Sequence, residues 1–107
     1  MQYPDRWLIL KLEHNGQTIY KLFSTWLGGY LDSNSWRLNS GITSIKPSGN
    51  SYIVSGHSGT KYDILPEAAG ASSYTALVLT QIKSQIKSAG GKLTVIDNID
   101  TYLKETS

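Results

Sequence analysis

Residues 7–24 read WLILKLEHNGQTIYKLFS, in which two apolar runs are separated by Asn15-Gly16. Asn-Gly between such runs is a strong signal for a β-hairpin, because both residues of its two-residue turn must accept a positive φ. A turn of this length also sets the register of the two strands. One face should carry the pairs Leu12–Ile19, Leu10–Lys21 and Leu8–Phe23, and the other face the pairs Glu13–Thr18, Lys11–Tyr20 and Ile9–Leu22.

Short β segments continue after the hairpin. Turn clusters at residues 47–50 (Pro-Ser-Gly-Asn) and 56–59 (Gly-His-Ser-Gly) separate them. The expected strands are 35–40 and 41–46, which could also form one bent strand, followed by 51–55 and 60–65. Short strands joined by turns of this kind predict an antiparallel meander.

A helical pattern follows the β segments. A serine at 72 or 73 can cap a helix from Tyr74 to about Ala89, and Gly90-Gly91 is a typical helix stop. The apolar residues of this helix are Tyr74, Val78, Ile82 and Ile86, which recur every four positions, together with Leu77 and Leu79. Such spacing predicts an amphipathic helix with one face on the sheet.

The C-terminal segment adds two elements. Residues 92–96 predict a last strand, and Asp97 can cap a short helix behind it. The whole pattern predicts an α+β fold, in which an antiparallel β-sheet of about five or six strands packs against one amphipathic helix, with a short C-terminal helix. At 107 residues we expect a single domain spanning 1–107.

The composition narrows the classes of function. The chain has no cysteine, which excludes disulfides, thiolate catalysis and cysteine-bound metals, and which favours the cytoplasm. The net charge is only +2, with scattered lysines. Lys11 interrupts the apolar run near the N-terminus, so we expect neither a signal peptide nor a membrane span.

Residues 26–42 hold the most unusual chemistry of the chain, with two tryptophans and a tyrosine around Gly28-Gly29. One interpretation is a structural corner whose tryptophans fill the core. The other is a surface that binds a partner, since Trp, Tyr and Arg are enriched at binding hot spots. The candidate binding residues are Trp26, Tyr30 and Trp36 for contact area, and Asp32 and Arg37 for orientation.

Catalytic and metal-binding patterns are weak. The turn around His57 lacks the spacing of a nucleophile elbow, and the two histidines, His14 and His57, have no ligand partners at metal-binding spacing. No phosphate-binding glycine motif occurs. We therefore expect no metal, no cofactor and no assigned catalytic residue. A small hydrolase or isomerase that uses His57 with a carboxylate such as Asp63 remains an alternative.

Two kinds of binding remain. A protein partner or a second copy of the chain is the favoured hypothesis, and a small ligand is the related alternative. Binding of single-stranded nucleic acid is less favoured at this net charge, and would use tyrosines as stacking platforms with nearby cations. Its residues would be Tyr20, Tyr52, Tyr62 and Trp36 with Arg37, Lys11, Lys46 and Lys61. In size and in its lack of cysteine and catalytic motifs, the chain resembles small proteins of phages and mobile gene cassettes, a resemblance that transfers no residues.

Overall fold

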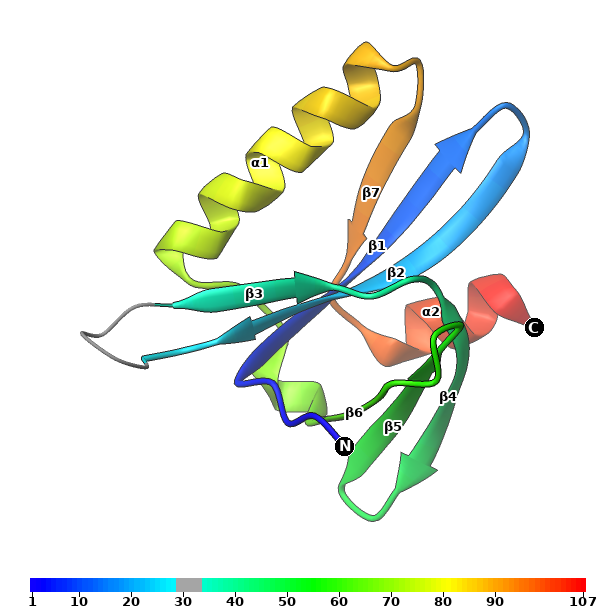
Figure 1. Ribbon diagram of the computed structural model, residues 1–107. Coiled ribbons are helices and arrows are strands. Elements are labelled where there is room, and N and C mark those ends of the chain that lie inside the picture. Colours follow the sequence, from blue (N-terminus) through cyan, green and yellow to red (C-terminus); the bar gives the residue numbers. More distant parts are fainter. Residues whose placement is uncertain (29–33) are drawn as a thin grey trace.

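The computed structural model describes residues 1–28 and 34–107. In this part of the chain, strands and helices alternate with short turns (Figure 1). The strands are β1 (Arg6–His14), β2 (Gln17–Trp26), β3 (Ser35–Leu38), β4 (Ile42–Ser48), β5 (Ser51–Gly56), β6 (Lys61–Ile64) and β7 (Lys92–Ile96). The helices are α1 (Ser73–Ser88), α2 (Ile99–Thr106) and a short 3-10 helix (Pro66–Ala68).

The N-terminal hairpin has the register expected from its turn. All the predicted cross-strand pairs are present, from Leu8–Phe23 to Glu13–Thr18. Asn15 and Gly16 have φ values of 51° and 76°, as a two-residue turn of this kind requires. The local chemistry of two residues thus sets the pairing of the two longest strands.

The predicted α+β class is confirmed, but the described strands divide between two antiparallel sheets. The first has the order β3-β2-β1-β7 and the second the order β4-β5-β6. The division occurs between β3 and β4, where the chain bends away from β2. There the Asn39 N–H donates to the Leu22 carbonyl (3.0 Å) and the Leu22 N–H donates to Asn39 Oδ1 (2.7 Å). The buried Asn39 side chain therefore takes the place of the next strand residue.

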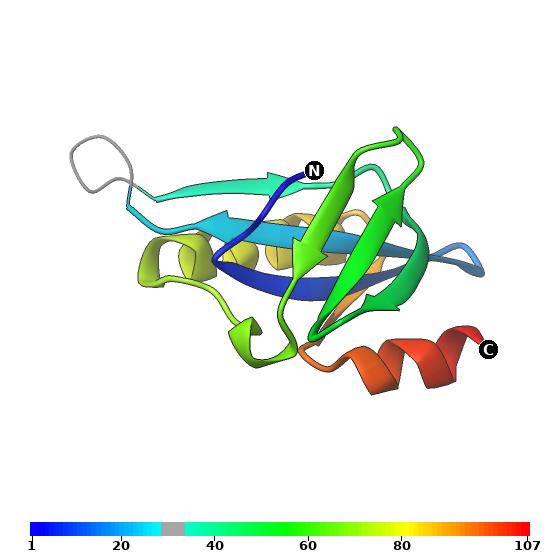
Figure 2. The same cartoon turned by 90° about the horizontal axis from the view of Figure 1, so that it is seen from below.

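The layers stack on the two faces of the four-stranded sheet, as Figure 2 shows. We call the face under α1 the outer face, and the face under the three-stranded sheet and α2 the inner face. The inner core comprises Trp7, Ile9, Leu22, Ile45, Val54, Tyr62, Ile64, Ile96, Ile99 and Tyr102. The outer core comprises Leu8, Leu10, Phe23 and Leu93, against which α1 packs Val78, Leu79, Ile82 and Ile86.

Both helices have the expected positions, with two differences in detail. Ser72 caps α1, and its side chain and that of Thr75 form a reciprocal capping box. Tyr74 and Leu77, which share the apolar spacing, are 51% and 66% exposed, because the buried line of α1 starts at Thr75 instead. The cap of α2 is Asn98, whose side chain accepts a hydrogen bond from Thr101 N–H, and not Asp97.

Candidate interaction surface beside α1

The structure separates the residues of the predicted aromatic corner. Tyr30 and Asp32 lie outside the described residues. In the β2–β3 pair, Trp26 lies opposite Ser35 and Trp36 lies opposite Thr25. Because adjacent residues of a strand point to opposite faces, the two tryptophans lie on opposite faces of the sheet. They do not form one surface together.

Trp26 contributes to the inner core. It is half-buried and packs against the inner cluster beneath the three-stranded sheet. Arg37 is exposed and, one step from Trp36 along β3, lies on the same face as Trp26. Trp26 therefore fits the interpretation in which a tryptophan of residues 26–42 fills the core.

Trp36 lies on the outer face and covers Phe23. The two rings stack with their centroids 5.7 Å apart and their planes at 26°. Offset stacking of this kind is a favourable aromatic arrangement. Phe23 is fully buried, whereas Trp36 remains 40% exposed. One side of the indole thus closes the core while the rest of the ring is open to a partner.

The first turn of α1 lies over the same part of the sheet. The hydroxyls of Thr25 and Thr75 are joined by a buried hydrogen bond of 3.0 Å, and Thr25 is the cross-strand neighbour of Trp36. Figures 1 and 2 show the start of α1 over the end of the β2–β3 pair. The residues around Thr75 therefore lie close to Trp36.

Tyr74 faces the β3 side of α1. Lys83 and Lys87 line a groove with β7 on the other side of the helix. At about 100° per residue, Tyr74 lies about half a turn from Lys83, and hence toward β2 and β3. Leu77 follows it at the i+3 position, about 60° further round the helix and away from the sheet. We call Trp36, Tyr74 and Leu77 the aromatic surface.

Sequence reasoning found Trp36 but placed Tyr74 and Leu77 on the buried side of the helix. The signal that distinguishes them is the capping box: once Ser72 is the cap, Thr75 is the residue that points back toward the sheet. Tyr74 then falls on a flank of α1. The tertiary contact between Thr25 and Thr75 could not be predicted from the spacing of apolar residues in the sequence.

The charged residues of the outer layer are mostly basic. No Asp or Glu occurs in α1, β2, β3 or β7. Lys83 and Lys87 lie on α1, and Lys21 lies on the outer face opposite Leu10, whereas Arg37 and Lys92 lie on the inner face. The described part of the outer layer is therefore basic on balance, although Asp5, whose Oδ2 accepts a hydrogen bond from the Leu27 N–H (2.7 Å), adds an acidic group at the end of β2. A partner with acidic groups would match it.

The sheet tyrosines of the nucleic-acid hypothesis lie on the inner side. Tyr62 is 2% exposed and belongs to the inner core. Tyr20 lies under α2 with its ring edge-on to Tyr102, at a centroid distance of 5.2 Å. Tyr52 is half-buried against the same cluster. These rings do not form an open stacking platform.

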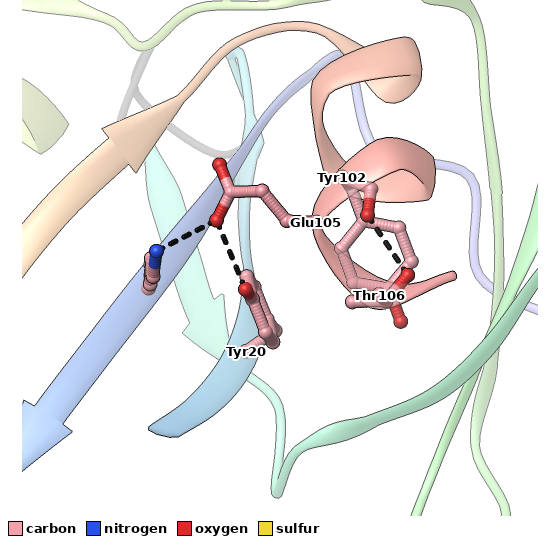
Figure 3. A network of polar contacts seen from close by, with 5 residues as sticks. Tyr20, Tyr102, Glu105 and Thr106 are labelled. Carbon is pink, nitrogen blue, oxygen red and sulfur yellow. Dashed lines mark hydrogen bonds and ion pairs between the residues drawn. The ribbon is translucent and has the colours of Figure 1, made fainter. Parts of the chain in front are cut away.

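A polar contact between α2 and the hairpin covers this inner region (Figure 3). Glu105 Oε1 accepts a hydrogen bond from the Tyr20 hydroxyl (3.0 Å) and pairs with Lys11 Nζ (2.7 Å). These two contacts hold the pKa of the Glu105 carboxyl below its ordinary value. Burial, followed by the bond to Glu105, raises the pKa of the Tyr20 hydroxyl. Lys11 is thus engaged in holding α2.

The suggested catalytic pair is not brought together. His57 is exposed in the turn after β5, while Asp63 lies opposite Ile53 in the β5–β6 pair. Ile53 and His57 are four residues apart, which is roughly 13 Å along a strand. Among residues 1–28 and 34–107, no group of three or more His, Asp or Glu side chains is placed to hold a metal ion.

Comparisons with protein-family models, with curated protein sequences and with solved structures find no match to this chain. Within the described residues, no helix has the length and apolar character needed to cross a membrane.

Proposed function

We propose that this protein is a binding module that recognises a protein partner through the aromatic surface of Trp36, Tyr74 and Leu77. The observation that carries the proposal is the position of Trp36, which stacks on buried Phe23 yet leaves 40% of its surface exposed. Large exposed aromatics on a rigid support are typical of interface hot spots. The β2–β3 pair and the capped start of α1 supply that support.

A protein partner fits this surface better than a small ligand does. Small ligands bind in pockets that enclose most of their surface. Side chains that are 40% to 66% exposed do not enclose a ligand in this way. A surface contributed by a strand and a helix, in contrast, is suited to an apolar patch on another protein.

The cationic surroundings favour a different protein over a second copy. Self-association through this surface would bring together two copies of α1, which carries Lys83 and Lys87 and no acidic residue, so like charges would oppose each other. We therefore propose that the partner binds through an apolar patch that has an acidic rim. A cysteine-free chain is consistent with such a role in the cytoplasm.

Selection of peptides from a random displayed library tests the proposal. Peptides selected on the purified protein are measured by fluorescence anisotropy against wild type, Trp36→Ala, Tyr74→Ala and a control, Leu103→Ala, which removes an exposed leucine on α2. We expect Kd to rise about tenfold or more for the first two variants, as at interface hot spots, and to change less than about twofold for the control.

Circular dichroism and denaturation distinguish loss of binding from loss of fold. Trp36→Ala should cost about 0.5–1.5 kcal/mol through the lost stacking on Phe23, and a further amount through the apolar surface that the indole buries. Tyr74→Ala, at an exposed helix position, should cost still less. If the selected peptides bind both variants as tightly as wild type, the aromatic surface is not the binding site. If sedimentation equilibrium shows a dimer that Trp36→Ala dissociates, the partner is a second copy and the proposal of a different protein is wrong.

A further inference from the structure

The flank of α1 opposite the aromatic surface opens onto a groove. Lys83 and Lys87 of α1, Gly91 and residues 92–95 of β7 line it, and its volume is 670 Å³. Val95, on its floor, is 39% exposed. The groove therefore joins an apolar strip of strand to two lysines that extend from the neighbouring helix.

One wall of this groove is an open sheet edge. β7 is the last strand of the four-stranded sheet and pairs with β1 alone among the described strands. In an antiparallel pair, alternate backbone N–H and C=O groups point away from the partner strand. An edge of this kind is a template for an added strand, which is how many domains bind extended peptides.

The charge of the groove selects among the segments that could add to it. α1 and β7 together contain Lys83, Lys87 and Lys92 and no acidic residue. Glu13 lies opposite Lys92 in the β1–β7 pair, so the cationic character of the groove comes chiefly from Lys83 and Lys87. A second copy of β7 would bring the same lysines against these, which disfavours edge-to-edge dimerisation.

The spacing of the two helix lysines matches a strand. Residues four apart on a helix are separated by about 6 Å along its axis, and alternate residues of a strand by about 6.6 Å. Figure 1 shows α1 alongside β7, so a strand added to β7 would run beside Lys83 and Lys87. Acidic residues at alternate positions of that strand would face the two lysines in turn.

We infer that the edge of β7 binds an acidic, extended segment of a partner protein, which adds a strand to β7 and places carboxylates at alternate positions against Lys83 and Lys87. Backbone hydrogen bonds to β7 supply affinity. The lysines supply selectivity for acidic segments. This site is separate from the aromatic surface, on the other side of α1, and neither proposal depends on the other.

A labelled peptide of alternating valine and glutamate tests the inference by fluorescence anisotropy. Wild type is compared with the double variant Lys83→Glu/Lys87→Glu and with Lys46→Glu/Lys104→Glu, a matched control with the same charge change at exposed lysines on β4 and α2. We expect Kd to rise at least tenfold for the first variant and less than twofold for the control. Trp36→Ala should bind the peptide as wild type does.

Two further peptides separate strand addition from charge attraction. N-methylation of alternate residues of the peptide removes its backbone N–H donors without changing its charge. We expect the methylated peptide not to bind, and not to cause the changes in the NMR signals of the β7 amides that the unmethylated peptide causes. The inference would be overturned if the methylated peptide bound as tightly as the unmethylated one. It would also be overturned if the two double charge variants lost affinity to the same extent. If a single-stranded oligonucleotide of matched charge binds more tightly and displaces the peptide, the groove is a nucleic-acid site and the inference is wrong. Circular dichroism checks that each variant is folded.

Discussion

The two faces of the four-stranded sheet are covered to different extents. The three-stranded sheet and α2 cover the inner face, where Trp7, Ile9 and Leu22 are fully buried. Among the described elements α1 alone covers the outer face, and along its two flanks Trp36 and Val95 are 40% and 39% exposed. A single helix is about 10 Å wide, whereas four strands span about 14 Å between the outermost strand axes. Side chains near both edges therefore remain accessible.

This difference assigns roles to residues that look alike in the sequence. Trp26 and Tyr62 face the inner layer and contribute to the core, whereas Trp36 and Tyr74 lie outside it. Both of our proposed binding surfaces lie on the outer side, one on each flank of α1. Both cores support those surfaces: Ile9 and Leu22 of the inner core are fully buried, and so are Leu10 and Phe23 of the outer core.

The largest expected effect distinguishes the two faces by stability. Ile9→Ala removes a fully buried side chain of the inner core and should cost about 2–5 kcal/mol. Val95→Ala, on the outer face at the sheet edge, should cost about 1 kcal/mol or less. Urea denaturation monitored by tryptophan fluorescence measures both. Equal costs would show that Val95, at the edge of the outer face, is as closely packed as Ile9 in the inner core.

The bend between the sheets gives the next largest effect. Asn39→Ala leaves the buried Leu22 N–H without its acceptor, which should cost about 1–3 kcal/mol. Thr43→Ala, which removes an exposed hydrogen bond to the Ser55 carbonyl, is the control and should cost under about 0.5 kcal/mol. Hydrogen exchange should show faster opening at β3 and β4 in the Asn39 variant. A cost no larger than that of the control would mean that the bend does not need this side chain.

The smallest effect concerns the ion pair on the inner side. The lowered pKa of Glu105 means that its contribution to stability is present above the ordinary value of 4.5 and is lost as pH falls through the lowered pKa. Lys11, whose pKa is raised chiefly by its hydrogen bond to Glu105, loses its contribution as pH rises through that raised value. In the Glu105→Gln variant, the free energy of unfolding should therefore change slightly less than in wild type as the pH falls into the acid range. Because the pair is partly exposed, the change should be small.

Thermal unfolding between neutral and acid pH measures this effect. Glu67→Gln is the control, since Glu67 is exposed and makes no ion pair in the described part of the chain. If Glu105→Gln lowered stability as much as Ile9→Ala does, the inner face would depend on the ion pair rather than on apolar burial.

Prediction from sequence succeeded where the signal was local. The hairpin register followed from Asn15-Gly16, and the bounds of β7 agree with the predicted 92–96. It was less accurate where neighbouring candidates compete: Asn98 rather than Asp97 caps α2, because its side chain is the one that accepts the Thr101 N–H. The separation of β3 and β4 into two sheets depends on the contact of Asn39 with Leu22, seventeen residues earlier.

The sequence by itself determined the elements of this protein, because turns, caps and periodicity act through φ, ψ and hydrogen bonds within a few residues. Only the tertiary structure decided which layer each element joined, and hence that Trp26 faces the core while Trp36 and Tyr74 face outward. That choice depends on contacts such as Thr25 with Thr75 and Tyr20 with Glu105, which join residues 50 and 85 positions apart. Exposure, and with it the candidate binding surface, is a property of the packed layers.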